Sequence, residues 1–271
     1  MAAKTVLVTG ASSGIGEATA LRYGAAGAHV LLLARNAERL YGVAHAIRAG
    51  GGTATAFPLD LQGSEATRDT AARIEAEIGT PDLLINNAGA GRWLPLVDTG
   101  PEEARAMIDV PYLAAFNLTR AFAPAMIARG SGGLVFVTSP ASYLAWPNAS
   151  AYIAARRALA GFAEALQAEL KGTGVVVTLV VLGTVDTPYW EHNPDSRKNV
   201  PHADPRLMPT LTPKQAADAI FEGAAQKKLF VVKPAAYRAL FVLNALFPKT
   251  VASQLRKASK RARTASGESI P

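Results

Sequence analysis

The stretch TGASSGIG (Thr9–Gly16) follows the apolar run TVLV at residues 5–8 and precedes a pattern of helical period. Its glycines have the spacing Gly-x-x-x-Gly-x-Gly. Gly10 permits a tight turn after a strand, and Gly14 and Gly16 let the backbone of a following helix approach that turn closely. Free N–H groups at the start of such a helix attract anionic phosphate. The stretch therefore predicts a strand–loop–helix unit with a phosphate site, the alternative being an ordinary glycine-rich turn.

Apolar runs of strand length recur along the chain and are separated by longer patterns of helical period. The expected strands cover residues 5–10, 29–35, 53–60, 82–89, 133–139, 174–183 and 229–232. Because these runs are apolar throughout, they are typical of a parallel sheet that helices cover on both faces. The expected fold is α/β, with a doubly wound parallel sheet of the Rossmann type. We expect a single domain at residues 1–235, followed by a basic C-terminal extension at residues 236–271.

Composition excludes several classes of protein. The chain has 271 residues, of which 49% are hydrophobic and 18% charged, as in an ordinary globular protein. It has no cysteine, which rules out disulfides and thiolate metal sites, and its four histidines lack ligand spacing, so no metal is expected. No leader or membrane-spanning run is expected, and the expected location is cytoplasmic.

The positive charge is concentrated at the C-terminal end. Residues 227–271 carry ten Lys or Arg against one acid, Glu268, a net charge of +9. The whole chain has a net charge of +7, which leaves −2 for residues 1–226. The body of the protein therefore lacks the basic surface of a nucleic-acid-binding protein, and no nucleic-acid partner is expected.

Further motifs follow the glycine-rich stretch in a fixed order. They are Asp60-Leu61, NNAG at Asn86–Gly89, Ser139, Tyr152 thirteen residues later, and LGTVDT at Leu182–Thr187. Together they resemble the short-chain dehydrogenase/reductase family over about residues 4–235. The resemblance implies an oxidoreductase with a nicotinamide cofactor, a small-molecule substrate and a homodimeric or homotetrameric assembly. The expected cofactor-binding residues are Gly10, Ser12, Ser13, Gly14, Ile15, Gly16, Arg35, Asp60, Leu61, Asn87, Ala88, Gly89, Tyr152, Arg156 and Thr187.

The end of the second expected strand bears on the choice of cofactor. An NAD site usually has an acid there that accepts a hydrogen bond from the ribose 2′-hydroxyl, whereas this chain has Ala34 followed by Arg35. Without the acid nothing repels a 2′-phosphate, and the planar guanidinium of Arg35 can pair with it. NADP(H) is therefore expected in preference to NAD(H). The alternative is that Arg35 is a solvated loop charge.

Three residues are expected to be catalytic, namely Tyr152, Ser139 and Arg156. By the resemblance, Tyr152 donates or accepts a proton while hydride moves to or from the nicotinamide, and Ser139 hydrogen-bonds the substrate oxygen. The family has lysine four residues after the tyrosine, where this chain has Arg156. Positions i and i+4 of a helix share one face, so Arg156 can favour the phenolate form of Tyr152. Arginine stays protonated, however, and cannot relay a proton as lysine does.

A second departure from the family lies at Pro111, in the stretch DVPYLAAF (residues 109–116), where the family usually has asparagine. Proline removes a backbone donor and kinks a helix, which frees a carbonyl about one turn earlier, near Met107. The alternative is that Asn117 is the equivalent residue.

The predicted function is hydride transfer between NADP(H) and a hydrophobic ketone or secondary alcohol. The two departures keep a second hypothesis open, a non-redox catalyst or a cofactor-binding scaffold on the same fold.

Two segments are expected to border the substrate. The proline-rich segment at residues 188–213 has the position of a substrate lid, and long loops of this kind are usually functional or disordered. Four aromatic residues either line an apolar pocket or merely pin this loop: Trp93, Trp146, Tyr189 and Trp190. The segment at residues 237–263 is basic and amphipathic, with Val251, Leu255 and Ala258 on one face. It contacts an anionic membrane surface peripherally, packs on a neighbouring subunit, or covers the substrate pocket.

Overall fold

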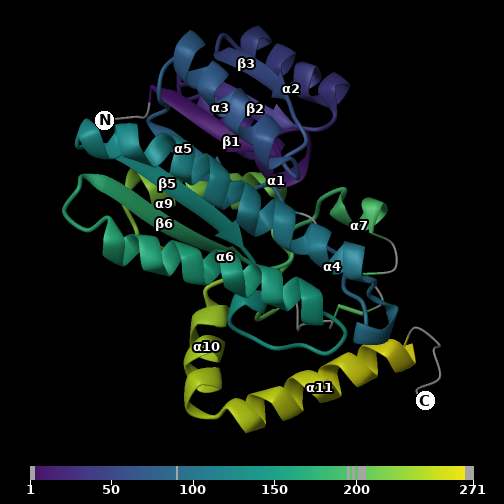
Figure 1. The fold of residues 1–271 in the computed structure, drawn as a ribbon. Helices are drawn as coiled ribbons and strands as arrows, with labels where there is room; N and C mark the ends of the chain where they lie inside the picture. The colour runs from purple at the N-terminus through teal and green to yellow at the C-terminus, as the bar shows by residue number, and fades with distance from the viewer. Residues whose placement is uncertain (1–3, 90, 194–195, 197–198, 201–205, 266–271) are drawn as a thin grey trace.

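The sheet has seven strands, all parallel, in the order β3-β2-β1-β4-β5-β6-β7 (Figure 1). This computed structural model describes residues 4–265 except residues 90, 194–195, 197–198 and 201–205. The strands are β1 (Thr5–Thr9), β2 (His29–Ala34), β3 (Thr53–Pro58), β4 (Leu83–Asn86), β5 (Gly132–Thr138), β6 (Val175–Leu182) and β7 (Phe230–Lys233). The chain runs outward from β1 in both directions, which confirms the predicted doubly wound, Rossmann-type fold. All seven predicted strands are present.

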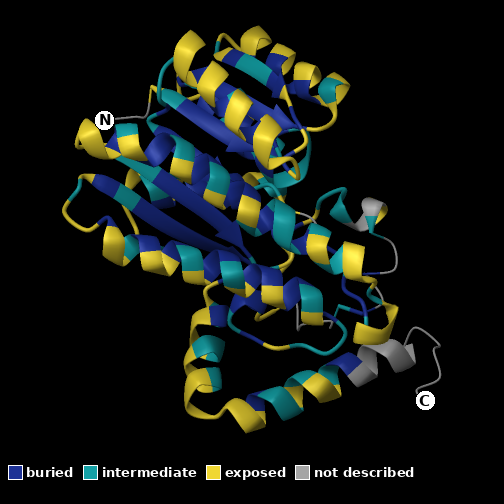
Figure 2. Cartoon of the chain, viewed as in Figure 1, coloured by how far each residue is buried: buried dark blue, intermediate teal, exposed yellow. Residues whose placement is uncertain are grey.

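Helices cover both faces of this sheet. On one face lie α1 (Gly14–Gly24), α2 (Ala37–Ala49) and α9 (Pro213–Ala225), and on the other α3 (Ser64–Glu77), α5 (Ala114–Ala128) and α6 (Ser150–Glu169). The remaining helical elements are η1 (Leu96–Asp98), α4 (Pro101–Ile108), η2 (Asp109–Leu113), η3 (Pro140–Ser142), α7 (Tyr189–His192), α10 (Ala236–Leu246) and α11 (Pro248–Ala265). Figure 2 shows the strands buried between helices whose outer faces are exposed.

The alternation of side chains along each strand divides the core into two parts. In β1, Val6 and Val8 belong to the cluster under α1, α2 and α9, whereas Leu7 belongs to the cluster under α3, α5 and α6. All three side chains are fully buried. Both faces of the strand are apolar because both faces are covered, which is the physical reason for the continuous apolar runs in the sequence.

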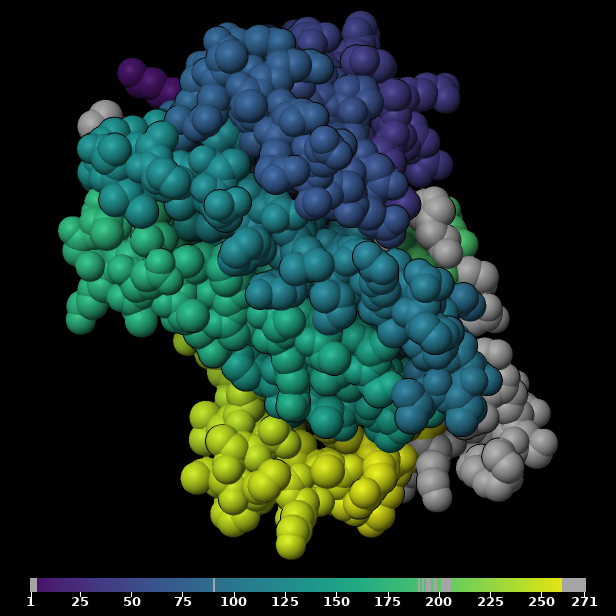
Figure 3. All heavy atoms as spheres, in the orientation of Figure 1, coloured from purple at the N-terminus to yellow at the C-terminus, as the bar shows by residue number. Residues whose placement is uncertain are grey.

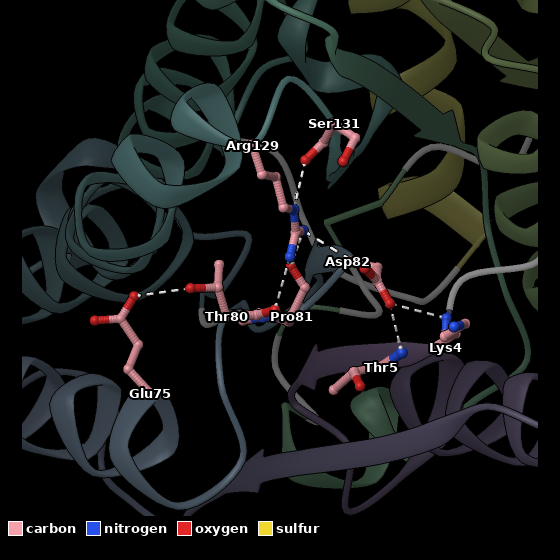
Figure 4. A network of polar contacts seen from close by, with 8 residues as sticks. All are labelled: Lys4, Thr5, Glu75, Thr80, Pro81, Asp82, Arg129 and Ser131. Atoms are coloured by element: carbon pink, nitrogen blue, oxygen red, sulfur yellow. Dashed lines mark hydrogen bonds and ion pairs between the residues drawn. The ribbon is translucent and has the colours of Figure 1, made fainter.

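A polar network ties the strands together at their amino ends, opposite to the edge where ligands bind in such sheets (Figure 4). Asp82 accepts hydrogen bonds at 2.9 Å from the backbone N–H groups of Lys4 and Thr5. The guanidinium of Arg129 donates to the carbonyls of Thr80, Pro81 and Ser131 at 2.7–3.0 Å and lies 3.6 Å from the Asp82 carboxylate. The network fixes the starts of β1, β4 and β5 relative to one another.

The helical segment around Pro111 is interrupted. Between α4 and α5 the backbone forms a π-helical stretch, η2, in which Ala114 donates to the carbonyl of Asp109. Pro111 has no N–H, so it cannot donate to the carbonyl of Met107 as a helix would require. A π-bulge is a common response to such a gap. Neither Pro111 nor Asn117 on α5, the alternative equivalent, is among the residues that line the cleft described below.

The C-terminal end forms an arm, which we define as α10 and α11. It leaves β7 and runs along the edge of the α/β body, where Figure 3 shows it in yellow. The inner side of α10 is anchored by a hydrogen bond of 3.0 Å from Nδ2 of Asn244 to the carbonyl of Tyr143, and by Phe241, whose ring centroid lies 4.9 Å from that of Tyr143. Within the described residues we find no helix whose length and apolar content would let it span a bilayer.

Candidate active site

One cleft, with a volume of about 1450 Å³, opens at the carboxyl ends of the strands. Residues that follow five successive strands of the sheet line it: Gly10 after β1, Arg35 after β2, Asp60 after β3, Asn87 after β4 and Ser139 after β5. Parallel strands bring these loops to one edge of the sheet, which is where doubly wound folds bind ligands. All the sequence-predicted site residues line this cleft except Gly16.

The glycine-rich loop turns sharply between β1 and α1. Gly10 and Gly14 have φ angles of +67° and +59°, in the left-handed region that favours glycine. Gly16 lies behind the loop rather than in the cleft, and a Cβ there would come within 2.1 Å of the carbonyl oxygen of Gly10. Its role is thus the close packing of α1 on the loop. Ser13 is the N-cap of α1, its hydroxyl makes no capping hydrogen bond, and it lines the cleft.

Thr9 joins this loop to the end of β4. Its Oγ1 accepts hydrogen bonds of 2.9 Å from the backbone N–H groups of Asn87 and Ala88. The Asn87 side chain returns a bond of 3.0 Å to the carbonyl of Thr9. Mutual hydrogen bonds therefore hold the NNAG segment beside the glycine-rich loop. An ordinary strand-end turn, in which asparagine is common, would not require these bonds.

Two arginines line the cleft beside the ends of β2 and β3. Arg35 and Arg39 are both exposed, and neither is in an ion pair with any described residue. Asp60 also lines the cleft, and its Oδ1 accepts a hydrogen bond of 3.1 Å from the N–H of Gln62. Arg39 was not predicted. Its position at i+4 from Arg35, in the first turn of α2, is the signal that would have identified it.

Ser139 and Ser142 lie at the carboxyl end of β5 and have different contacts. The Ser139 hydroxyl accepts a bond of 3.2 Å from the N–H of Ala141, which leaves its own proton available to a group in the cleft. The Ser142 hydroxyl lies 2.8 Å from that of Thr138 and donates to the backbone carbonyl of Arg156 at 2.9 Å. Ser142 thus fixes α6, which carries Tyr152 and Arg156, relative to β5.

Tyr152 and Arg156 share one face of α6 and both line the cleft. The guanidinium carbon of Arg156 lies 4.9 Å from the centroid of the Tyr152 ring. The Arg156 side chain is 9% exposed, and its Nε has no hydrogen-bond partner among the described residues. A Cβ at Gly89 would come within 2.6 Å of Nη2 of Arg156, so glycine at that position makes room for the wide guanidinium.

Tyr189 is a second phenol near the site but has a different role. Its hydroxyl donates to the carbonyl of Gly91. Burial raises the pKa of Tyr189, and the neighbouring Tyr152 raises it further, against the opposing charge of Arg156. A phenol that is committed to a carbonyl and disfavoured as phenolate is a poor proton-transfer group. Tyr189 therefore lines the cleft as a hydrogen-bond donor to the backbone and not as a proton-transfer group.

The described part of the predicted lid is fastened to Trp93. The hydroxyl of Ser196 accepts from the N–H of Trp93 at 3.0 Å, and Nδ2 of Asn199 donates to its carbonyl at 2.8 Å. The ring of Trp93 lies 5.6 Å from that of Tyr152 and 5.9 Å from that of Trp146, measured between centroids. Trp93, Trp146 and Tyr189 line the cleft; the side chain of Trp190 and residues 194–195, 197–198 and 201–205 lie outside the described part of the lid.

The arm also contributes to the cleft, and its inner face was not assigned there from the sequence alone. Its lining residues are Tyr237, Leu240, Gln254, Leu255, Lys257 and Ala258. Val251 is buried and Leu255 packs on the core, as expected for one apolar face, but this face is turned toward the protein. The inner side of this segment therefore lies along the cleft, which favours the alternative that it covers the pocket.

Three independent features of the cleft suit a nicotinamide dinucleotide. A glycine-rich loop leads into the N-terminus of α1, which suits a pyrophosphate. Arg35 and Arg39 line the cleft without ion-pair partners among the described residues. The Nε of Arg156 is buried without a partner beside Tyr152, which is the state expected of a donor that waits for a ligand hydroxyl. No cluster of three His, Cys, Asp or Glu side chains in the described part of the chain is arranged to hold a metal ion.

These features define an α/β protein with a nucleotide-binding cleft, and comparison with known proteins identifies the family. The chain matches the family model for short chain dehydrogenases over residues 4–198. It therefore belongs to the short chain dehydrogenase family, a class of NAD(P)-dependent dehydrogenases and reductases.

Individual relatives agree with this assignment. The chain is 37% identical over 207 residues to a short chain dehydrogenase of Pseudocercospora fijiensis, covering 75% of this chain and 66% of that protein. It is 35% identical over 219 residues to a fatty acyl-CoA reductase of Acinetobacter baylyi, covering 80% and 71%. A short-chain dehydrogenase from Sphingobium yanoikuyae in complex with NADPH superposes with a TM-score of 0.78 at 26% identity, covering 94% and 97%. The chain spans between 44% and 66% of the length of the first curated relatives it matches.

Proposed function

We propose that this chain transfers a hydride between NADP(H) and a hydrophobic ketone or secondary alcohol. The observation that carries the proposal is the convergence of Ser139, Tyr152 and Arg156 on the same cleft as the glycine-rich loop. A bound nicotinamide supplies or accepts the hydride. The apolar residues around Tyr152, with Trp93 and Trp146 beside it, suit a substrate without charge at the reacting end.

Each of the three residues has a separate task in this proposal. Tyr152 gives a proton to the carbonyl oxygen during reduction and takes it back during oxidation. Ser139, whose proton is available, donates a hydrogen bond to the same oxygen as negative charge develops there. Arg156 holds a positive charge 4.9 Å from the ring of Tyr152, favours the phenolate, and offers its unpartnered Nε to a ribose hydroxyl of the cofactor. Because arginine stays protonated, the proton that Tyr152 exchanges with solvent travels by a route other than this side chain.

The preference for NADP(H) rests on the end of the cleft near β2. Ala34 supplies no carboxylate there, and Arg35 and Arg39 offer two guanidinium groups without ion-pair partners among the described residues. Guanidinium pairs well with phosphate, so a 2′-phosphate adds favourable contacts at this position. Asp60 and Leu61 flank the adenine, and Thr187 reaches the nicotinamide amide or a phosphate, as the family resemblance implies.

A panel of hydrophobic ketones and alcohols with NADPH or NADP, followed at the nicotinamide absorbance, tests the proposed activity. Turnover of several apolar ketones supports it. Tight NADPH binding without turnover of any carbonyl or alcohol would favour the alternative, a non-redox catalyst or cofactor-binding scaffold. None of the relatives found supports that alternative.

The remaining proposals concern organisation. We assign residues 1–235 to the NADP-binding catalytic domain, with a lid at about 188–213, and residues 236–271 to the C-terminal extension. A homodimer or homotetramer is supported by partly exposed aromatic side chains on α5 and α6, where Phe116 is 38% exposed and its ring lies 5.5 Å from that of the half-buried Phe162. Light scattering of the purified protein tests this assembly.

We also propose a cytoplasmic location with peripheral contact to anionic membrane through residues 237–263. The support is the outer side of the arm, where Val242, Leu243, Leu246 and Phe247 are between 48% and 66% exposed. Lys249 and Arg256 are exposed on the same arm. An apolar ridge beside basic side chains is suited to the interface of an anionic bilayer.

A further inference from the structure

The inner face of the arm forms one wall of the cleft. Positions 251, 254, 255 and 258 of α11 have the spacing i, i+3, i+4 and i+7, which places them on one side of the helix. Val251 is 7% exposed, and Gln254, Leu255 and Ala258 line the cleft. From α10, Tyr237 and Leu240 line it as well. The arm therefore turns an apolar stripe toward the cleft, although a separate apolar ridge lies on its outer side.

The same cleft contains both this wall and the proposed catalytic residues. The ring of Tyr152 lies 5.6 Å from that of Trp93, which lies 5.9 Å from that of Trp146. Trp93, Trp146, Leu240 and Leu255 all line the cleft together with Tyr152. Apolar side chains thus border the cleft both at its reacting end and at the arm.

The charges along the cleft differ between its ends. Asp60 is the carboxylate that lines it within the described residues, and it belongs to the end next to β3. Lys257 lines the cleft from α11 and has no ion-pair partner among the described residues. Gln254, one turn earlier, adds a neutral polar group. A negatively charged group beside the arm would therefore meet a cation and no carboxylate.

The geometry points to an elongated, amphiphilic substrate. Its carbonyl lies at Tyr152 and Ser139, its apolar chain runs along Trp93 and Trp146 to the inner face of α11, and its far end carries an anionic group at Lys257. This inference rests on the proposed function and names the substrate class of the same site. The arm is then the specificity wall, and Leu255 and Lys257 are specificity-determining residues.

The wall is held in position by contacts of the arm with the body. Asn244 donates to the carbonyl of Tyr143 at 3.0 Å, and Arg238 donates to the carbonyl of Phe230 at 3.2 Å. The ring of Phe241 lies 4.9 Å from that of Tyr143, between centroids. Because these contacts are made by α10, substitutions of Leu255 or Lys257 on α11 leave them intact, although Leu255→Ala also removes a side chain that packs on the core.

Straight-chain methyl ketones of increasing length, each prepared with and without a terminal carboxylate, test the inference. We expect kcat/KM with NADPH to rise about two- to fourfold for each methylene until the chain reaches α11. A terminal carboxylate should raise kcat/KM by up to about fivefold in the long compounds and have no such effect in the short ones.

Two variants and two matched controls locate the effect. Leu255→Ala should lower kcat/KM for long ketones and leave short ketones unchanged. Lys257→Gln should remove the advantage of the carboxylate without changing the dependence on length. Leu246→Ala and Lys249→Gln change the same residue types at positions of the arm that do not line the cleft, and should behave as the unmodified protein.

A binding measurement makes the test independent of turnover. A long-chain fatty acid, titrated against the fluorescence of the tryptophans beside the cleft, should bind more weakly to Leu255→Ala and Lys257→Gln than to either control. Equal dissociation constants in all four variants would overturn the inference, as would turnover of ketones that depends on neither chain length nor end group. If no ketone is reduced but the fatty acid still binds more weakly to Leu255→Ala and Lys257→Gln than to the controls, the proposed function is wrong. The inference that the arm binds an amphiphilic molecule is then still supported.

Discussion

The guanidinium of Arg156 lies over the ring of Tyr152, with 4.9 Å between the guanidinium carbon and the ring centroid. The two residues are one helical turn apart on α6, and Gly89 leaves room for the guanidinium. Arg156 is nearly buried and its Nε is unpartnered within the described residues. A buried cation in this position acts on both the phenol beside it and the ligand in front of it, so its removal should have two effects.

We expect Arg156→Ala to lower both the rate and the affinity for NADPH. Loss of one charge-assisted hydrogen bond should weaken NADPH binding about 10- to 100-fold. Loss of the cation beside the phenol should move the alkaline rise of alcohol oxidation to higher pH, because the phenolate is then less favoured. Arg156→Lys keeps the charge but loses the planar fork, so partial activity is expected. Full activity of Arg156→Ala with an unchanged pH profile would make Arg156 a bystander.

Cofactor preference should depend on Arg35 and its neighbours. The unmodified protein should bind NADPH more tightly than NADH, measured by calorimetry. The double variant Ala34→Asp/Arg35→Ala supplies a carboxylate and removes a cation, so it should reverse that order. Arg39→Ala should weaken NADPH binding and leave NADH unchanged, whereas Arg68→Ala, an exposed arginine outside the cleft, should change neither. Equal affinities of the unmodified protein for the two cofactors would contradict the assignment.

The hydroxyl of Thr9 should matter for stability. Thr9→Val leaves the N–H groups of Asn87 and Ala88 without their acceptor, so the free energy of unfolding should fall by about 1–3 kcal/mol. Thr19→Val is the matched control, because Thr19 is equally buried and its hydroxyl only donates to the carbonyl of Ile15 within α1. Chemical denaturation measures both. An equal loss of unfolding free energy in the two variants would show that the hydrogen bonds of Thr9 to Asn87 and Ala88 contribute no more to stability than the bond of Thr19.

Membrane contact should depend on the outer side of the arm. The protein should sediment with anionic vesicles at low salt, and the bound fraction should fall as salt rises, since exposed charges are screened beyond about 10 Å at 0.1 M. Leu246→Ser/Phe247→Ser should reduce binding, whereas Leu96→Ser/Val97→Ser, an even more exposed apolar pair outside the arm, should not. Equal recovery with neutral and anionic vesicles would remove the electrostatic part of the proposal.

The sheet and the glycine-rich loop could be predicted from the sequence because both are encoded locally. Apolar runs such as TVLV have strand length, and the glycine spacing at Gly10 and Gly14 is matched by left-handed φ angles. The expected strands were one to three residues too long at some ends, as at residues 82–89, where β4 is Leu83–Asn86. At the carboxyl ends of the first five strands the extra residues belong to loops that line the cleft.

The place of the arm could not be predicted, for a physical reason. The spacing of Val251, Leu255 and Ala258 identifies an apolar face, but a face alone does not name what covers it. Trp146, which lines the same cleft, comes from a segment about 100 residues earlier, and only the folded sheet brings the two segments to one cleft. The same holds for Arg39, which reaches the cleft because α2 begins directly after the turn at Asn36.

The measurement that tests the central claim most directly compares Tyr152→Phe with Tyr189→Phe in reduction of an apolar ketone by saturating NADPH. Tyr152→Phe removes the proton donor and should lower kcat by about 100-fold or more, while NADPH still binds. Tyr189→Phe removes a hydroxyl that donates to the carbonyl of Gly91, so it should retain most of the rate. A Tyr152→Phe variant that reduces the ketone at the rate of the unmodified protein would contradict the account.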